Sequence, residues 1–277
     1  MPLPAEFKFT QSNLQDYVEC ARRFELRYVQ QLQYPAVEAE PIIDHEKHMQ
    51  QGATFHHMVH QHDLGVPESV LSNLAHEEPL KTWWANYLNH KLDLPEQRHA
   101  ETALTAPLAG FRLLAKYDLL AIAPGEKAII VDWKTSTRKP DRLQLKNRLQ
   151  TIMYPYLLVR AGAHLNGGTP IQPEQVEMIY WFADDSIQTE RFPYSTEQYH
   201  EDEKHLSDLI TEINNRTIFD LTSQEWRCKF CTYRSLCRRG TSAGNLDDLN
   251  ALPEDVIGDD ADADIDFDFD QIAEVEF

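Results

Sequence analysis

The spacing of apolar side chains predicts that the chain begins with helices. A first helix is expected from Ser12 to about Gln33, opened by a capping box of Ser12 and Gln15. Its apolar residues recur three and four positions apart and form one buried stripe: Leu14, Tyr17, Ala21, Phe24 and Tyr28. Two further helices are expected over residues 50–63 and 70–92.

From residue 111 the apolar positions change to the spacing of strands. Residues 111–122 and 127–133 form a predicted hairpin around residues 123–126, whose Pro and Gly favour a turn. The elements expected after it are a helix, two strands and a last helix, over 143–160, 176–183, 188–193 and from Ser195 onward. Because helices and strands are mixed along the chain, we predict an α/β fold.

Charge divides the chain into a body and a tail. The net charge is -19, but residues 247–277 contain 13 Asp or Glu and no Lys or Arg, which leaves -6 on the rest. Such dense like charge opposes folding, so we expect one domain over 1–244 and a disordered acidic tail over 245–277. A mildly acidic body argues against a broad basic DNA-binding face, but not against a local basic groove.

The composition favours a protein of the cytoplasm. No apolar run is long enough to span a membrane, and the first ten residues lack the charged and apolar regions of a signal peptide. Without export, the four cysteines are expected to stay reduced, which favours metal binding over disulfides.

Three of the four cysteines lie together late in the chain. Cys228 and Cys231 form a Cys-x2-Cys pair, and Cys237 offers a third thiolate after a five-residue gap. A fourth thiolate can come only from Cys20, so we predict a metal cluster that joins the two ends of the fold. Structural zinc sites usually pair two close-spaced knuckles, so this pattern favours an iron–sulfur cluster, with zinc as the alternative.

The predicted hairpin carries the charged residues of a candidate catalytic site. Asp132 and Lys134 are two apart on its second strand and share a face, and Asp118 on the first strand can face them. Two carboxylates beside an ammonium can hold Mg²⁺ or Mn²⁺ on oxygen ligands. The metal would activate a water and neutralise a phosphate, while the lysine stabilises the charged transition state. On its own, the pattern also describes a solvated strand end with a salt bridge.

Further motifs accompany this pair in a specific order. A Gly-x-x-x-His motif, Gly52 to His56, precedes the Asp-x-Lys-Thr motif, and Gln150 and Tyr154 follow on one face of a predicted helix. Together with residues 17–24 and the cysteines, this order resembles the RecB-like branch of the PD-(D/E)xK nuclease superfamily. The Cys-x2-Cys-x5-Cys run resembles the iron–sulfur clasp of AddB-type and CRISPR-associated exonucleases. The resemblance covers roughly residues 10–240.

The resemblance implies a fold and a set of residue roles. The fold is a restriction-endonuclease-like core, with a central mixed sheet flanked by helices, closed by an iron–sulfur subdomain. Mg²⁺ or Mn²⁺ would bind to four residues: His56, Asp118, Asp132 and, through its carbonyl, Trp133. Lys134 would be the catalytic lysine, and Gln150 and Tyr154 would support the site or position DNA. A 4Fe–4S cluster would bind to Cys20, Cys228, Cys231 and Cys237.

We therefore expect metal-dependent hydrolysis of DNA phosphodiesters, mainly from single-stranded ends, in DNA repair, recombination or processing. A phosphate-binding rim is expected from basic residues directly after the Asp-x-Lys strand: Arg138, Lys139, Arg142, Lys146 and Arg148. No helicase motif occurs, so unwinding would need a helicase or repair protein as partner. The alternative is a non-catalytic DNA-binding module with an architectural metal cluster. The acidic tail would promote solubility, dock a partner or inhibit the protein itself.

Overall fold

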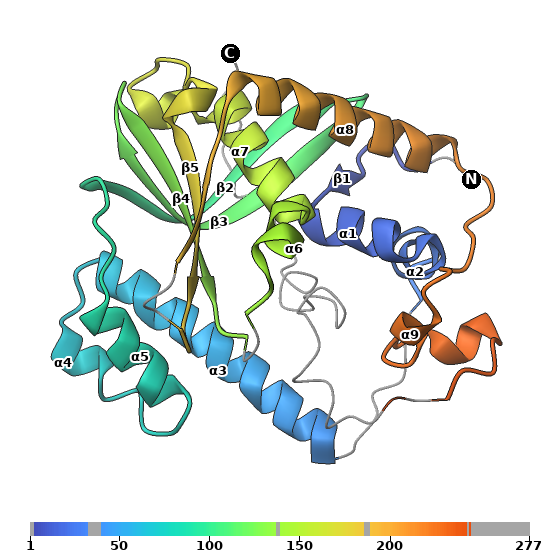
Figure 1. The fold of residues 1–277 in the computed structure, drawn as a ribbon, viewed down its shortest axis with the longest axis horizontal. Helices are drawn as coiled ribbons and strands as arrows, with labels where there is room; N and C mark the ends of the chain where they lie inside the picture. Colours follow the sequence, from blue (N-terminus) through green and yellow to red (C-terminus); the bar gives the residue numbers. More distant parts are fainter. Residues whose placement is uncertain (1–2, 33–39, 137–138, 186–188, 243, 245–277) are drawn as a thin grey trace.

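A six-stranded mixed sheet lies at the centre of the described part of the chain (Figure 1). The computed structural model describes residues 3–32, 40–136, 139–185, 189–242 and 244, without the side chains of 40–46. The strands are β1 (Lys8–Phe9), β2 (Gln97–Leu108), β3 (Phe111–Ala123), β4 (Lys127–Lys134), β5 (Val176–Phe182) and β6 (Glu190–Pro193). The prediction of an α/β fold with a mixed sheet is confirmed.

Strand β3 organises the sheet. It pairs with β2 antiparallel along nearly its whole length, and with β1 and β4 at its beginning and its end. Strand β4 pairs parallel with β5, which pairs antiparallel with β6. The two-residue turn between β2 and β3 has positive φ angles at Ala109 (50°) and Gly110 (84°), a conformation in which glycine avoids the steric cost of a side chain.

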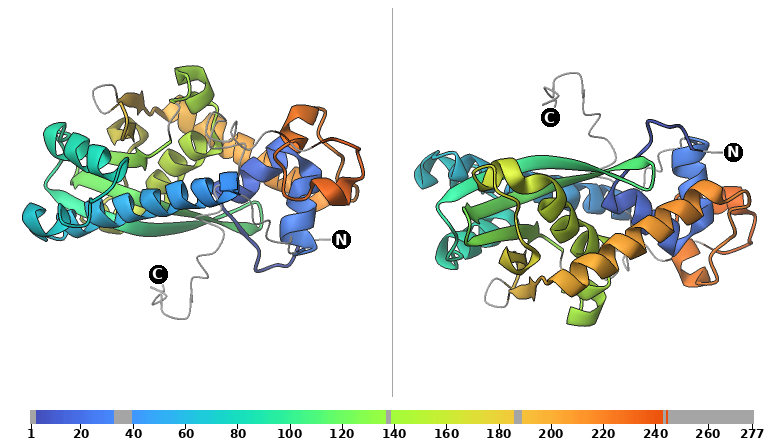
Figure 2. Two further views of the ribbon diagram at one scale, coloured as in Figure 1. Left: turned by 90° about the horizontal axis from the view of Figure 1, so that it is seen from below. Right: turned by 90° about the horizontal axis from the view of Figure 1, so that it is seen from above.

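Helices cover both faces of the sheet, with α3 and α8 on opposite sides (Figures 1 and 2). One face packs against α3 (Glu40–Asp63), α4 (Glu68–Leu71) and α5 (Leu80–Asn89). The other face packs against α1 (Gln11–Glu19), α6 (Arg142–Lys146), α7 (Leu149–Ala161) and α8 (Thr196–Asn215). The short helical turns 162–166 and 173–175 lead from α7 into β5.

The two ends of the described fold lie side by side (Figures 1 and 2). Helix α1 continues through α2 (Ala21–Phe24) and a π-helical turn (Glu25–Val29). Against these pack α9 (Glu225–Cys228) and a 3₁₀ turn (Arg234–Cys237). In the described residues, no helix is both long and apolar enough to cross a membrane.

Several predicted elements have different boundaries in the structure. The first helix begins at the N-cap Thr10, not at Ser12, and ends at Glu19, where Cys20 adopts an extended backbone. The single helix expected over 70–92 is the pair α4 and α5, because the chain turns before Pro79, and the residue preceding a proline disfavours helix. The helix expected over 143–160 is α6 and α7, and the hairpin over 111–133 is confirmed.

Candidate active site

The β3–β4 hairpin brings three of the predicted site residues together. The pairing of Leu119 with Val131 places Asp118 beside the start of the Asp-x-Lys motif, and the backbone N–H of Trp133 donates to Asp118 Oδ2 at 2.8 Å. Lys134 Nζ lies 3.0 Å from Asp132 Oδ2, and both side chains are buried. The alternative of a solvated strand end is therefore wrong for Asp132 and Lys134.

One face of α3 lies against this hairpin, in steps of four residues. A ring nitrogen of His48 lies 3.1 Å from the carbonyl oxygen of Thr135, and His56 Nδ1 lies 3.4 Å from Asp118 Oδ1. Between them, a Cβ on Gly52 would lie only 2.8 Å from Thr135 Oγ1. The glycine of the Gly-x-x-x-His motif thus permits the close approach that brings His56 to Asp118.

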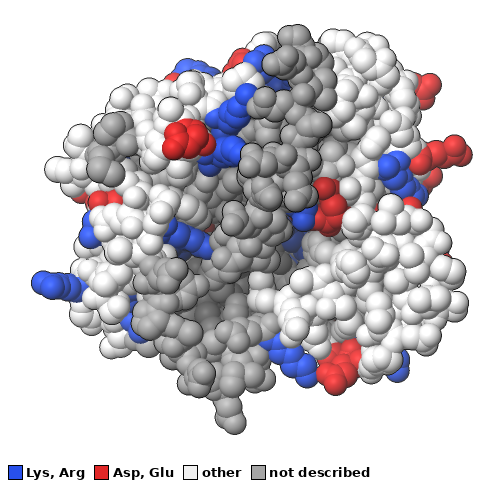
Figure 3. Space-filling model, turned by 180° about the vertical axis from the view of Figure 1, so that it is seen from behind, with Lys and Arg blue, Asp and Glu red and all other residues white. Residues whose placement is uncertain are grey.

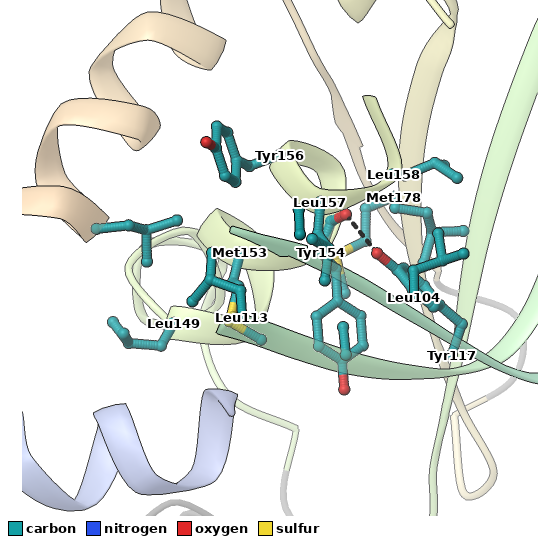
Figure 4. Close-up of a cluster of buried hydrophobic side chains, with 14 of the residues drawn as sticks. Leu104, Leu113, Tyr117, Leu149, Met153, Tyr154, Tyr156, Leu157, Leu158 and Met178 are labelled. Atoms are coloured by element: carbon teal, nitrogen blue, oxygen red, sulfur yellow. Dashed lines mark hydrogen bonds between the residues drawn. The ribbon is translucent and has the colours of Figure 1, made fainter. Parts of the chain in front are cut away.

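Helix α7 supports both strands of the hairpin from the other side. Gln150 donates from Nε2 to Asp132 Oδ1, so it orients one carboxylate directly. The Tyr154 ring packs 4.9 Å from the ring of Tyr117, whose hydroxyl donates to the Tyr154 carbonyl (Figure 4). Tyr154 is only 4% exposed and packs against the strand that carries Asp118.

The two aspartates of the site have opposite pKa shifts. Burial raises the pKa of Asp132 to about 7 against the attraction of Lys134, and the charge of Asp118 adds to the rise. Burial also opposes the charge of Asp118, but His56 and the N–H of Trp133 outweigh it and hold the pKa of Asp118 below its usual value. The pKa of His56 is raised to about 9 because Asp118 and Asp132 overcome the effect of burial. Divergent pKa values of two close carboxyls are typical of catalytic and metal-binding sites.

Glu101 of β2 also lies beside His56 and Asp118, and no sequence motif identified it as a site residue. Ligand atoms of His56, Glu101 and Asp118 lie within 4.8 Å of one another. Carboxylate oxygens and an imidazole nitrogen are donors that suit Mn²⁺ and, through the oxygens, Mg²⁺. The side chains present therefore fit a divalent cation.

The predicted basic rim is largely compensated by acid. Lys139 Nζ and Arg142 Nη1 lie 3.2 and 2.9 Å from the carboxylate of Glu190. Arg148 is buried, whereas Lys146 is exposed. Arg138 lies outside the described residues. On the face drawn in Figure 3, the visible Lys and Arg side chains are scattered among Asp and Glu. Lys139 and Arg142 are thus paired with Glu190, and the phosphate-binding rim stays a prediction.

The four cysteines line one pocket at the junction of the two chain ends. Cys20, Cys228, Cys231 and Cys237 are free thiols, and four arginines share the lining: Arg23, Arg227, Arg234 and Arg239. Arg239 Nη1 lies 3.6 Å from Cys228 Sγ. Among the described residues, no three cysteine sulfurs lie within 4.8 Å of one another. The pocket thus gathers the thiols loosely.

Comparison with known proteins gives one family and several similar structures, two of which are described here. The sequence model described as the PD-(D/E)XK nuclease superfamily matches residues 8–238. The protein in the crystal structure of SSO0001 is 13% identical to this chain in sequence, with a TM-score of 0.40. The match covers 87% of this chain and 90% of that chain. A protein described as a candidate exonuclease from Eubacterium rectale is 10% identical, with a TM-score of 0.47, and covers 90% and 94%. No curated protein matches the chain.

Proposed function

Because the chain belongs to the PD-(D/E)XK nuclease superfamily, we propose that it is a metal-dependent deoxyribonuclease acting on single-stranded DNA ends. The observation that carries this proposal is the buried pair of Asp132 and Lys134, 3.0 Å apart, with Asp118 and His56 beside it. A binding module would have no need to bury an ammonium and a carboxylate together, because buried charges cost free energy unless they are paired.

The side chains divide the work of phosphodiester hydrolysis between them. A bound divalent cation would polarise the phosphate and supply a water of lowered pKa. Asp118 and Asp132 would hold that cation, together with His56 and the carbonyl of Trp133. Gln150 keeps Asp132 in position. Lys134, fixed by its ion pair with Asp132, would donate to the phosphate oxygen that gains charge in the transition state.

We propose a 4Fe–4S cluster for the cysteine pocket. Cys20, Cys228, Cys231 and Cys237 line one pocket, which supports a single group bound by all four thiolates. One Cys-x2-Cys pair, a five-residue gap and a distant cysteine fit the paired knuckles of structural zinc less well. The arginines of the pocket would offset the charge of four thiolates, and the cluster would join the chain ends and supply no step of hydrolysis.

The setting that we propose is DNA repair, recombination or processing in the cytoplasm, in the RecB-like branch of the superfamily. Four free thiols support a reducing compartment. A helicase or repair protein would open duplex DNA for the site. The acidic tail would compete with nucleic acid for the protein or dock that partner; it lies outside the described residues.

The test is a nuclease assay on anaerobically purified protein with end-labelled single- and double-stranded DNA, in Mg²⁺ or Mn²⁺. Asp132→Ala and Lys134→Ala should each lower the cleavage rate about a hundredfold to a thousandfold, because Asp132 would hold the cation and Lys134 would donate to the transition state. Asp208→Ala and Lys204→Ala are matched controls, since these residues form an exposed ion pair on α8.

Two results would reject the proposal. Cleavage that survives both active-site substitutions would place the chemistry elsewhere or in a contaminant. Cluster-loaded protein that binds DNA but cleaves no substrate with either metal would favour the non-catalytic module. Labels at the 5′ and the 3′ end give the polarity of an exonuclease.

A further inference from the structure

Glu101 lies between two residues of β2 that pair with the two neighbours of Asp118 on β3. The pairs on either side are Ala100 with Leu119 and Thr102 with Tyr117. Like charges on neighbouring strands are destabilising. Each of these carboxylates has a basic group beside it, since the Lys116 ammonium pairs with Glu101 and His56 Nδ1 lies 3.4 Å from Asp118 Oδ1.

At Glu101 and Asp118, the buried side chains of β2 and β3 change from one face of the sheet to the other. Ala100 and Leu119 pack in the core under α3, whereas Leu104 and Tyr117 pack in the core under α7. Glu101 itself has a positive φ of 52°, which a residue with a side chain adopts rarely. This local turn of the strands brings Glu101 and Asp118 to the same place as His56 of α3, with ligand atoms within 4.8 Å.

We infer that Glu101 is a ligand of the divalent cation, on a site formed with His56 and Asp118. The inference rests on the proposed function, because Asp118 is shared with the Asp132 side of the active site. Without a metal, the Lys116 ammonium pairs with Glu101, and both side chains are partly exposed, so a cation from solvent can displace it. One imidazole nitrogen with two carboxylates suits Mn²⁺ better than Mg²⁺, which prefers oxygen ligands. We therefore expect the site to bind Mn²⁺ more tightly than Mg²⁺.

The test is a Mn²⁺ titration of the full chain, in which electron paramagnetic resonance measures the free aquo ion. Glu101→Gln should weaken Mn²⁺ binding at least tenfold. Lys116→Met should tighten it severalfold, because the competing ammonium is gone. Glu126→Gln is the matched control: it is the same substitution in an exposed turn of the neighbouring hairpin and should leave the affinity unchanged. Mg²⁺ should compete poorly with Mn²⁺ in the wild type.

Each outcome decides one point. Wild-type affinity in Glu101→Gln overturns the inference, as does a wild type that binds no Mn²⁺. If Glu101→Gln does not fold, an unchanged affinity in Lys116→Met overturns it instead. If the wild type cleaves DNA and Glu101→Gln binds Mn²⁺ with wild-type affinity, only the role of Glu101 is rejected and the nuclease proposal stands. A wild type that binds Mn²⁺ through Glu101 but cleaves no DNA keeps the metal site and rejects the nuclease.

Discussion

Single buried carboxylates in this protein differ in what balances their charge. Asp16 has a cation beside it, since Arg23 Nη2 lies 2.7 Å away. Asp202 on α8 is also buried but accepts only neutral donors, the Tyr194 hydroxyl and the Gln198 amide, each at 2.9 Å. Burial therefore dominates, and the pKa of Asp202 rises from 3.8 to about 6. The folded protein thus holds this proton more tightly than the unfolded chain does.

Asp202→Asn should change how stability depends on pH. Because the pKa is raised on folding, ionisation of Asp202 destabilises the folded state as pH rises from about 4 to about 6. The unfolding free energy of the wild type should fall relative to Asp202→Asn through this window and then run parallel above it. Urea denaturation at several pH values measures the difference. Asp208→Asn, which alters an exposed carboxylate of the same helix, is the control. A constant difference between wild type and Asp202→Asn would contradict the prediction.

At this scale the sequence indicated some site residues and not others. Asp132 and Lys134 could be predicted because the period of a strand places them on one face. The pairing of Arg142 with Glu190 joins positions 48 apart, and no local pattern reveals it. Glu101 was not predicted from the sequence for the same reason, since only the register of β2 against β3 brings it to Asp118.

Between elements, the decisive contact is that of α3 with the end of β4. Gly52→Ala should destabilise the protein by about 1–3 kcal/mol, the usual cost of forcing an extra methyl group into a packed contact. The clash partner is the side chain of Thr135, which is stiff because it is branched at Cβ. The same shift would move His56 away from Asp118 and lower nuclease activity at limiting metal concentration.

A double-mutant cycle separates this contact from other effects. Thr135→Ala removes the Oγ1 that a Cβ on Gly52 would meet at 2.8 Å. In that background Gly52→Ala should cost nothing, and it gains up to about 1 kcal/mol, because alanine favours a helix more than glycine does. Guanidinium denaturation of the four proteins gives the coupling energy. Additive effects of the two substitutions would mean that the helix does not depend on this close approach.

The elements themselves were predictable where the apolar pattern was strong. The 111–133 hairpin and the strand from Val176 carry consecutive large apolar residues and appeared at their expected places. Strand β6 also appeared near its expected place, although Phe192 is its one large apolar residue. Strand β2 was missed, because Leu104 and Ala106 are its only buried residues and Pro107 near its end disfavours a strand. Cys20 interrupts the first helix although the apolar stripe continues, and this break places its thiol in the cysteine pocket.

In the molecule as a whole, charge is concentrated in the acidic tail. Residues 247–277 carry 13 acidic and no basic side chains, beside a body with a net charge of -6. If the tail competes with nucleic acid, a chain truncated after Ala243 should bind single-stranded DNA severalfold more tightly at low salt, and the gain should vanish at high salt. Fluorescence anisotropy with a labelled oligonucleotide measures both. Equal affinities at low salt would leave docking or solubility as the role of the tail.

The two chain ends are held together by protein contacts as well as by the cysteine pocket. Arg227 of α9 lies 3.0 Å from Glu19 of α1, and the Tyr233 hydroxyl donates to the carbonyl of Leu32 at 3.0 Å. These contacts pack the segments, but only a bound cluster would link them covalently through four thiolates. We therefore expect the cluster to control how often the C-terminal segment opens, with little effect on the central sheet.

Cys20→Ser tests whether the cluster holds the C-terminal segment in place without affecting the central sheet. The variant should lose most of the iron absorbance at about 400 nm, because loss of one of the four thiolates weakens binding of the cluster. Trypsin should then cut faster after Arg227, Lys229 and Arg234, while cleavage after Lys204 on α8 keeps the wild-type rate; mass spectrometry of the fragments gives both rates. Ser12→Ala, an alteration of α1 away from the cysteines, is the control.

If Cys20→Ser retains full iron and wild-type cleavage, Cys20 is not a ligand and the ends are held by the protein contacts alone. If every site is cut faster, the cluster stabilises the whole fold and not only the junction of its ends.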